Sequence, residues 1–196
     1  MTLVGSTKAG IDSMAKFLEL ARANPGKYQW GSTENTTRMT GELFRVQSGL
    51  KIENVMYKGA APMLQELTGG HIPIGMTSPL TAMSHHRAGT LRMLAVTTER
   101  RLAVIPDVPT MAEAGITGLA RPAWFPLFGP AGLSPALTRR IHEDVAAVLA
   151  EPETRARIAD LASEPGGEPP DAFAARIKEE LVVWRDTAKL AGIQPE

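Results

Sequence analysis

In the first half of the chain, short apolar runs alternate with segments whose apolar residues recur every three or four positions. The longer period predicts a helix from Ile11 to Ala21, which the turn sequence NPGK ends. Four short apolar runs predict strands, at 28–30, 53–57, 71–76 and 91–98. Helical spacing returns between each pair of runs. This order predicts an α/β domain with an open, mainly parallel sheet covered by helices.

The pattern changes from about Ala103. Prolines and glycines punctuate the next 30 residues, where we expect one short helix at TMAEAG (110–115). Three helices with apolar stripes then close the sequence. The first begins after Ser134 and carries the apolar stripe Leu137, Ile141, Val145 and Val148. The second is short, at 152–161, and the third has an apolar face from Phe173 to Trp184.

Three predicted strands are followed directly by helices, through the loops GSTENTTR (31–38), YKGAAP (57–62) and MTSPLT (76–81). In a parallel sheet these strand ends and helix starts lie on one edge. Each helix start offers unpaired N–H groups and the positive end of a dipole, and Thr36 fits as the N-cap of its helix. The three loops together predict a site for a small anion, most naturally a carboxylate.

The loops also carry side chains and glycines that suit such a site. Gly31 and Gly59 would let a ligand approach the backbone, Tyr57 supplies a phenol and Lys58 a cation. The small hydroxyls are Ser32, Thr33, Thr36, Thr37, Thr77 and Ser78. Each feature also has an ordinary structural interpretation: a hydroxyl before a helix caps it, a loop lysine is solvated, and a strand-end tyrosine packs.

Charge and composition exclude several other classes. Lys and Arg total 21, as do Asp and Glu, so the formal net charge is zero, which disfavours a nucleic-acid partner. The chain has no cysteine and hence no disulfide or thiolate site. The sequence shows no signal peptide and no membrane-spanning run. Adjacent His85 and His86 point apart on a helix and chelate poorly, so we expect no metal and no cofactor.

Several motifs, in order, resemble one family. They are LARANPGKYQWGS, GELF, YKGAAPMLQELTGGHIPIGMTSP, RAGTLRMLAVTTERR, IPDVPTMAEAG, WFPLFGPAGLSPALTRRIHEDVAAVLAEPETRARI and WRDTAKLAGI. Together they cover nearly the whole chain and are similar to the substrate-binding proteins of tripartite tricarboxylate transporters, the Bug or TctC family. The resemblance implies a periplasmic-binding-protein-like fold of type II, whose two lobes are joined by two crossing strands.

The resemblance also implies a function. Members capture small organic acids, such as di- and tricarboxylates or aromatic carboxylates, in the periplasm and deliver them to a membrane permease, without catalysis. Carried over, the ligand loops are Ser32 and Thr33, Thr36 and Thr37, Tyr57 to Ala60, and Thr77 with Ser78. Arg38 stands where the family often has a histidine, and it adds a cation near the site. Thr77 and Pro73 stand where the family often has acids, which points to a changed ligand or to lost binding.

The family resemblance also sets an expectation about domains. We expect a hinge-strand remnant at 1–10, the second α/β lobe at 11–120, and a hinge return with C-terminal helices at 121–196. The signal peptide and N-terminal half-lobe of the family have no counterpart in this sequence. The apolar faces of the C-terminal helices, which in the family pack on that half-lobe, then need another surface to cover them. We therefore expect that the chain self-associates or that these helices fold back onto the α/β lobe.

The alternative to a receptor is a shortened cytoplasmic homologue that acts as a sensor, an assembly module or an enzyme on a carboxylate. An enzyme would need paired acid–base groups in the pocket. The loops offer Glu34 as the nearby carboxylate and no convincing general base, so the receptor is favoured.

Overall fold

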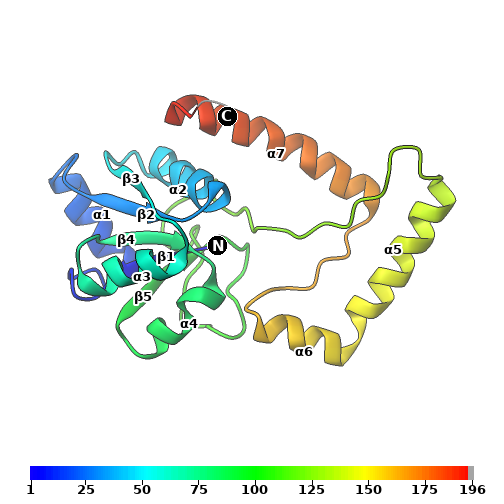
Figure 1. Cartoon of the computed structure of the whole chain (residues 1–196), viewed down its shortest axis with the longest axis horizontal. Helices are drawn as coiled ribbons and strands as arrows, with labels where there is room; N and C mark the ends of the chain where they lie inside the picture. The colour runs from blue at the N-terminus through cyan, green and yellow to red at the C-terminus, as the bar shows by residue number, and fades with distance from the viewer. Residues whose placement is uncertain (194–196) are drawn as a thin grey trace. The chain divides into compact units, whose positions relative to one another are not determined.

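The computed structural model describes residues 1–193, which form two compact units (Figure 1). Unit 1 comprises Met1–Ala123 and the chain from Thr187 onwards, and unit 2 comprises Trp124–Asp186. The chain therefore passes between the units twice. The domain boundaries expected from the sequence, at residues 10 and 120, remain a prediction. They mark hinge segments, which are defined by motion, whereas the two compact units are defined by packing.

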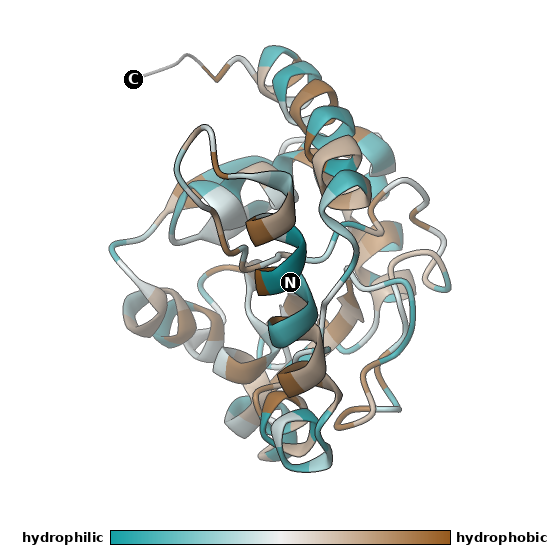
Figure 2. Ribbon diagram, turned by 90° about the vertical axis from the view of Figure 1, so that its right-hand side faces the viewer, coloured by the Kyte–Doolittle hydropathy of each residue, from teal (hydrophilic) through white to brown (hydrophobic). Residues whose placement is uncertain are grey.

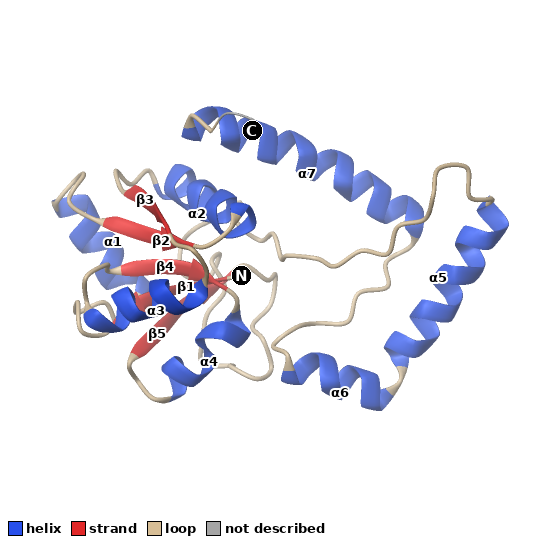
Figure 3. Cartoon of the chain, viewed as in Figure 1, coloured by secondary structure: helices blue, strands red, loops and turns tan. Residues whose placement is uncertain are grey.

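Unit 1 is built around a five-stranded sheet in the order β3-β2-β4-β1-β5, drawn in red in Figure 3. The strands are β1 (Thr2–Ser6), β2 (Gln29–Ser32), β3 (Glu53–Met56), β4 (Ile74–Thr77) and β5 (Leu91–Val96). Strand β2 pairs in parallel with β3 and β4, whereas β1 runs antiparallel to β4 and β5. Strand β5 consequently points the same way as β4. The predicted α/β lobe with a mainly parallel sheet is confirmed.

Both faces of the sheet are covered by helices. They are α1 (Met14–Ala23), α2 (Asn35–Ser48), α3 (Ala60–Gly69) and α4 (Pro79–Arg87). Successive residues of a strand face opposite sides, so β2 reveals which helix lies where. The Trp30 ring lies against Gly41 of α2, whereas a Cβ added to Gly31 would lie 2.8 Å from Met63 of α3. Helices α2 and α3 therefore cover opposite faces.

An aromatic cluster fixes α1 on the same face as α2. The Phe17 ring of α1 lies 6.2 Å from Tyr28 and 6.4 Å from Phe44 of α2, measured between centroids. Phe17, Phe44 and Trp30 are all fully buried. Gly41 makes this packing tight, because a Cβ there would lie 2.0 Å from the Trp30 ring. The apolar periodicity of the sequence thus corresponds to a real core.

The prediction of a short helix at 110–115 is wrong. This segment forms a turn instead, in which the Ala114 N–H donates to the Thr110 carbonyl over 3.0 Å. Gly115 ends the turn with φ +86°, a value that continues no right-handed helix. The Glu113 carboxylate accepts from the Thr110 N–H at 2.7 Å and from Arg101 Nε at 2.9 Å. The turn is thereby held beside the end of β5, where Thr110 bridges Val96.

Unit 2 consists of helices with little buried apolar surface. They are α5 (Pro135–Ala150), α6 (Pro152–Asp160) and most of α7 (Pro170–Ala191). Every residue of α5 and α6 is at least partly exposed, and Leu137 and Val148 of the expected stripe are 47% and 52% exposed. Hydrophobic and hydrophilic residues alternate along these helices (Figure 2). Within residues 1–193, no helix is both long and apolar enough to cross a bilayer.

Candidate functional site

The three loops singled out in the sequence meet at one edge of the unit 1 sheet. Ser32, the last residue of β2, is in register with Met56, the last residue of β3. On the other side of β2, Trp30 is in register with Ile74, which places Ser32 level with the end of β4. Helices α2, α3 and α4 start directly after these strand ends. We call the residues at this edge, 32–38, 57–60 and 77–78, the rim; it holds all the predicted binding residues together with Glu34 and Asn35.

The start of α2 is capped differently from the prediction. Glu34 is the N-cap, with extended φ and ψ of −155° and 169°, so the prediction that Thr36 caps this helix is wrong. The Thr37 hydroxyl accepts hydrogen bonds from the N–H groups of Thr33 (3.0 Å) and Glu34 (3.1 Å), and it donates to the Glu34 carbonyl. Thr37 therefore organises the loop, and Asn35 and Thr36 present the first N–H groups of the helix.

The start of α3 is the most open part of the rim. Gly59 is its N-cap and has φ +99°, a conformation that favours glycine. A Cβ at Gly59 would meet no atom of the described residues within 4 Å, so the backbone is accessible. Tyr57 is tied to the neighbouring loop, because its N–H donates to the Ser32 carbonyl at 2.8 Å. Lys58 and Gly59 are exposed, and Tyr57 and Ala60 are partly exposed.

Three other rim positions have structural roles, and the sequence predicted a capping role of this kind for the first of them. Ser78 caps α4: its hydroxyl accepts from the Thr81 N–H at 3.1 Å, and Pro79 follows at the first helical position. The buried Ser32 hydroxyl accepts from Asn54 Nδ2 of β3 at 2.9 Å. Thr77 is buried at the end of β4. Sequence reasoning missed Asn54, since its side chain reaches Ser32 only through the pairing of β2 with β3.

Gly31 does not have the role expected of it. The sequence suggested that it lets a ligand approach, but it lies inside β2, where a Cβ would lie 2.8 Å from both Met63 and Ile72. Its small size allows α3 to pack closely on the sheet. Of the two loop glycines, Gly59 alone leaves open backbone at the rim.

The rim has two cations and one carboxylate. Lys58 is exposed, Arg38 is partly buried in the first turn of α2, and Glu34 is exposed. The Nε of Arg38 is buried and has no hydrogen-bond partner among residues 1–193. Burial raises the pKa of the Tyr57 phenol above its ordinary value of 10.0, and the Glu66 carboxylate adds to the rise. At neutral pH the Tyr57 phenol is therefore neutral, and the two cations and one carboxylate give the rim a net charge of about +1.

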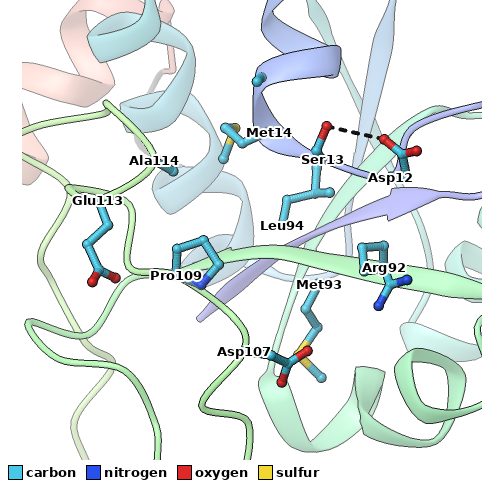
Figure 4. A pocket seen from close by; sticks show the side chains of 11 residues that line it. Asp12, Ser13, Met14, Arg92, Met93, Leu94, Asp107, Pro109, Glu113 and Ala114 are labelled. Carbon is cyan, nitrogen blue, oxygen red and sulfur yellow. Dashed lines mark hydrogen bonds between the residues drawn. The ribbon is translucent and has the colours of Figure 1, made fainter.

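Two hollows of unit 1 lie away from the rim. The larger, of about 740 Å³, lies between the start of α1, strand β5 and the 107–114 loop (Figure 4). Ser13 and Asp12 are hydrogen-bonded there, across from Arg92 and Glu113. The smaller, of about 220 Å³, is lined by Tyr28, His71 and their neighbours. None of the residues lining either hollow belongs to the rim, where the starts of α2 and α3 are exposed.

A metal centre finds no support in the part of the chain that the structure describes. No group of three or more His, Asp or Glu side chains within residues 1–193 is arranged to hold an ion. His86 is buried beside β5, where its Nδ1 accepts from the Met93 N–H at 3.2 Å and its Nε2 lies 3.4 Å from Asp107. These contacts explain His86 as a structural residue.

Comparison with known proteins assigns the chain to a family. The profile of the tripartite tricarboxylate transporter family receptor (TctC) matches residues 1–189. A Cupriavidus necator protein from the gbd 5′ region is 32% identical over 165 residues, which are 83% of this chain and 50% of the relative. BugT of Bordetella pertussis is 26% identical over 194 residues, which are 98% of this chain and 60% of BugT.

Solved structures lead to the same family. A protein from R. palustris, solved with adipate, superposes with a TM-score of 0.82 and 30% identity, covering 100% of this chain and 66% of that one. The chain thus spans about half to two thirds of the length of these relatives. With its profile match, its relatives and its fold in agreement, the chain belongs to the tripartite tricarboxylate transporter receptor family, the TctC or Bug proteins.

Proposed function

We propose that the rim binds a carboxylate of a small organic acid, and that the protein acts as a solute receptor that delivers this acid to a membrane permease. The observation that carries the proposal is the strand register, which brings the starts of α2, α3 and α4 to one edge. Helix N-termini attract anions through unpaired N–H groups and the helix dipole. The family consists of solute receptors and not of enzymes.

Within the rim, different residues would take different roles. The first N–H groups of α2 and α3 would hold the carboxylate oxygens. The open space at Gly59 would let the ligand approach, although the Gly59 N–H itself already donates to the Tyr57 carbonyl at 2.9 Å. Arg38 and Lys58 would supply positive charge, and Tyr57 would donate its phenol hydrogen. Ser32, Thr37 and Ser78 would act indirectly, because their hydroxyls already hold the loops in place. The remaining hydroxyl and backbone positions, Thr33, Thr36, Ala60 and Thr77, stay candidate contacts.

The chemistry of the rim agrees with a di- or tricarboxylate or an aromatic carboxylate. A ligand with one carboxylate at the rim would extend away from the sheet edge, since the starts of α2 and α3 are exposed there. The R. palustris relative was solved with adipate, a dicarboxylate, which supports this class of ligand. Receptors of this kind work in the periplasm, and we propose that location for this protein on the basis of its family.

Calorimetric titration with adipate and a panel of other organic acids tests the proposal. The Lys58→Ala variant should bind the best acid about 10-fold more weakly, since a hydrogen bond to a charged group contributes ~1.5 kcal/mol. Lys51→Ala is the matched control, because Lys51 is also exposed but lies before β3, at the opposite end from the rim. Binding that Lys58→Ala leaves unchanged, or acid turnover by the protein, would contradict the proposal.

A further inference from the structure

One methionine differs from all the others in its exposure. The chain has nine methionines and no cysteine, so thioethers are its only sulfur groups. Met1 and Met39 are partly exposed, whereas Met56, the last residue of β3, is 46% exposed. The other methionines, all buried, are Met14, Met63, Met76, Met83, Met93 and Met111. Met56 is therefore the methionine that an oxidant in solution reaches most easily.

The Met56 sulfur is hydrogen-bonded to the rim. The buried Ser32 hydroxyl donates to Met56 Sδ at 3.4 Å. The same hydroxyl lies 3.2 Å from Asn54 Oδ1, so two acceptors compete for one hydrogen. The Ser32 carbonyl in turn accepts from the Tyr57 N–H at 2.8 Å. Ser32 thus joins the Met56 side chain to the part of the rim in which α3 begins.

Oxidation of the Met56 sulfur would change this contact in two ways. A thioether is a weak acceptor, whereas a sulfoxide is polar, and its oxygen would draw the Ser32 hydrogen away from Asn54. The 3.4 Å between Sδ and the Ser32 oxygen is also a direct contact that leaves no room for a further oxygen between them. Either Met56 or Ser32 then has to move. Both are joined directly to Tyr57, one through the chain and one through a hydrogen bond, so the rim moves with them.

We propose that Met56 is an oxidation site whose sulfoxide rearranges the rim through Ser32. The oxidant is hydrogen peroxide: the sulfur lone pair attacks one oxygen, the O–O bond breaks as the S–O bond forms, and the other oxygen leaves as water. The sulfur loses two electrons and the peroxide gains them. Two thiols reverse the step, which yields the thioether, a disulfide and water, and methionine sulfoxide reductases catalyse this reversal. The consequence for acid binding rests on the proposed receptor function, whereas the oxidation itself does not.

Limited treatment with hydrogen peroxide, followed by tryptic digestion and mass spectrometry, tests the site. Trypsin releases the peptide 52–58, which contains Met56 alone, and the peptide 39–45, which contains Met39 alone. We expect Met56 to gain one oxygen about 10-fold faster than Met39, and the buried methionines to react more slowly still, since oxidation follows exposure. Oxidation of Met39, or of any buried methionine, at the rate of Met56 would overturn the proposal.

Amide signals in nuclear magnetic resonance spectra test the coupling to the rim, without any ligand. The signals of Thr33, Tyr57 and Gly59 should shift when Met56 is oxidised, and should return after treatment with a methionine sulfoxide reductase and dithiothreitol. Met56→Leu keeps the size of the side chain but lacks the sulfur, so peroxide should leave these signals in place. Met39→Leu is the matched control and should respond like the wild type. Unchanged rim signals in protein whose Met56 is fully oxidised, or equal shifts in Met56→Leu, would overturn the coupling.

Calorimetric titration with adipate links the oxidation to the proposed function. If the rim holds the acid, the oxidised protein should bind adipate about 5-fold more weakly, the equivalent of losing one neutral hydrogen bond. Met56→Leu should bind adipate equally well before and after peroxide treatment. An affinity that oxidation of Met56 leaves unchanged would overturn the coupling to the site. Failure of the untreated protein to bind any acid would contradict the receptor proposal alone, because the peptide and amide measurements need no ligand.

Discussion

The two units of the chain are stabilised by different interactions. The largest fully buried side chains of residues 1–193, among them Trp30, Phe17 and Phe44, lie in unit 1 between its sheet and its helices. Unit 2 has no comparable apolar core within the described residues, and its most buried polar group is Glu180, held by two indoles and an arginine. Folding of unit 1 therefore depends on apolar packing, whereas unit 2 depends on one polar and aromatic cluster.

Core truncation should show the largest difference between the units. Trp30→Ala should lower the free energy of unfolding by about 3–5 kcal/mol, because it empties a fully buried site against α2. Leu137→Ala in α5, where Leu137 is 47% exposed, should change it by less than about 0.5 kcal/mol. Urea denaturation followed by circular dichroism measures both. Both variants are measured at a concentration low enough to give a monomer, where a Leu137→Ala loss as large as that of Trp30→Ala would mean that the α5 stripe is covered within a single chain.

Self-association gives a second test of the difference between the two units. We propose that copies of the chain associate through the exposed apolar stripe of α5. Leu137, Val145 and Val148 are 47%, 38% and 52% exposed, and completing the burial of each would contribute about 1 kcal/mol. Light scattering should give an average mass that rises above 21.0 kDa with concentration. Val145→Lys should bring the mass back toward the monomer, whereas Lys51→Ala should not. A constant monomer mass at all concentrations would contradict the expectation.

The smallest expected effect is a pH dependence at the rim. The pKa of Tyr57 is raised by burial and by Glu66, so the folded state favours the neutral phenol. The resulting stabilisation is present below pH 10.0 and is lost as the pH rises through the raised pKa. Melting temperatures between about pH 9 and 11.5 should therefore fall less for Tyr57→Phe than for the wild type. Tyr28→Phe is the control, and an equal fall in wild type and Tyr57→Phe would contradict this assignment.

The sequence was most informative where local patterns correspond directly to structure. Apolar periodicity located β2 to β5 and α1 to α4, whereas β1 was expected only as a hinge-strand remnant from the family resemblance. The interpretation that a hydroxyl before a helix caps it is correct for Ser78, which is the N-cap of α4. The common edge of the three loops followed from the predicted parallel sheet, and the register of β2 with its neighbours confirms it. These features depend on contacts between residues that are close in sequence, or on a rule about sheet topology.

The remaining features depend on contacts between distant residues. The Ser32–Asn54 bond requires the pairing of β2 with β3, and the Glu180 cluster joins residues 56 positions apart. The packing role of Gly31 became visible only once α3 was placed over β2. At α2, several Ser and Thr residues compete to cap one helix, and the sequence alone could not show that Thr37 would bind the loop from within the first turn.

The most direct test of the central claim is a nuclear magnetic resonance titration of the protein with adipate. If the rim holds the carboxylate, the amide signals of Thr36, Gly59 and Ser78 should shift together and saturate. Signals from the hollow of Figure 4, such as those of Ala15 and Leu94, should stay in place. Shifts confined to that hollow, or no saturable shift at the rim with any acid of the panel, would contradict the proposal that this sheet edge is the binding site.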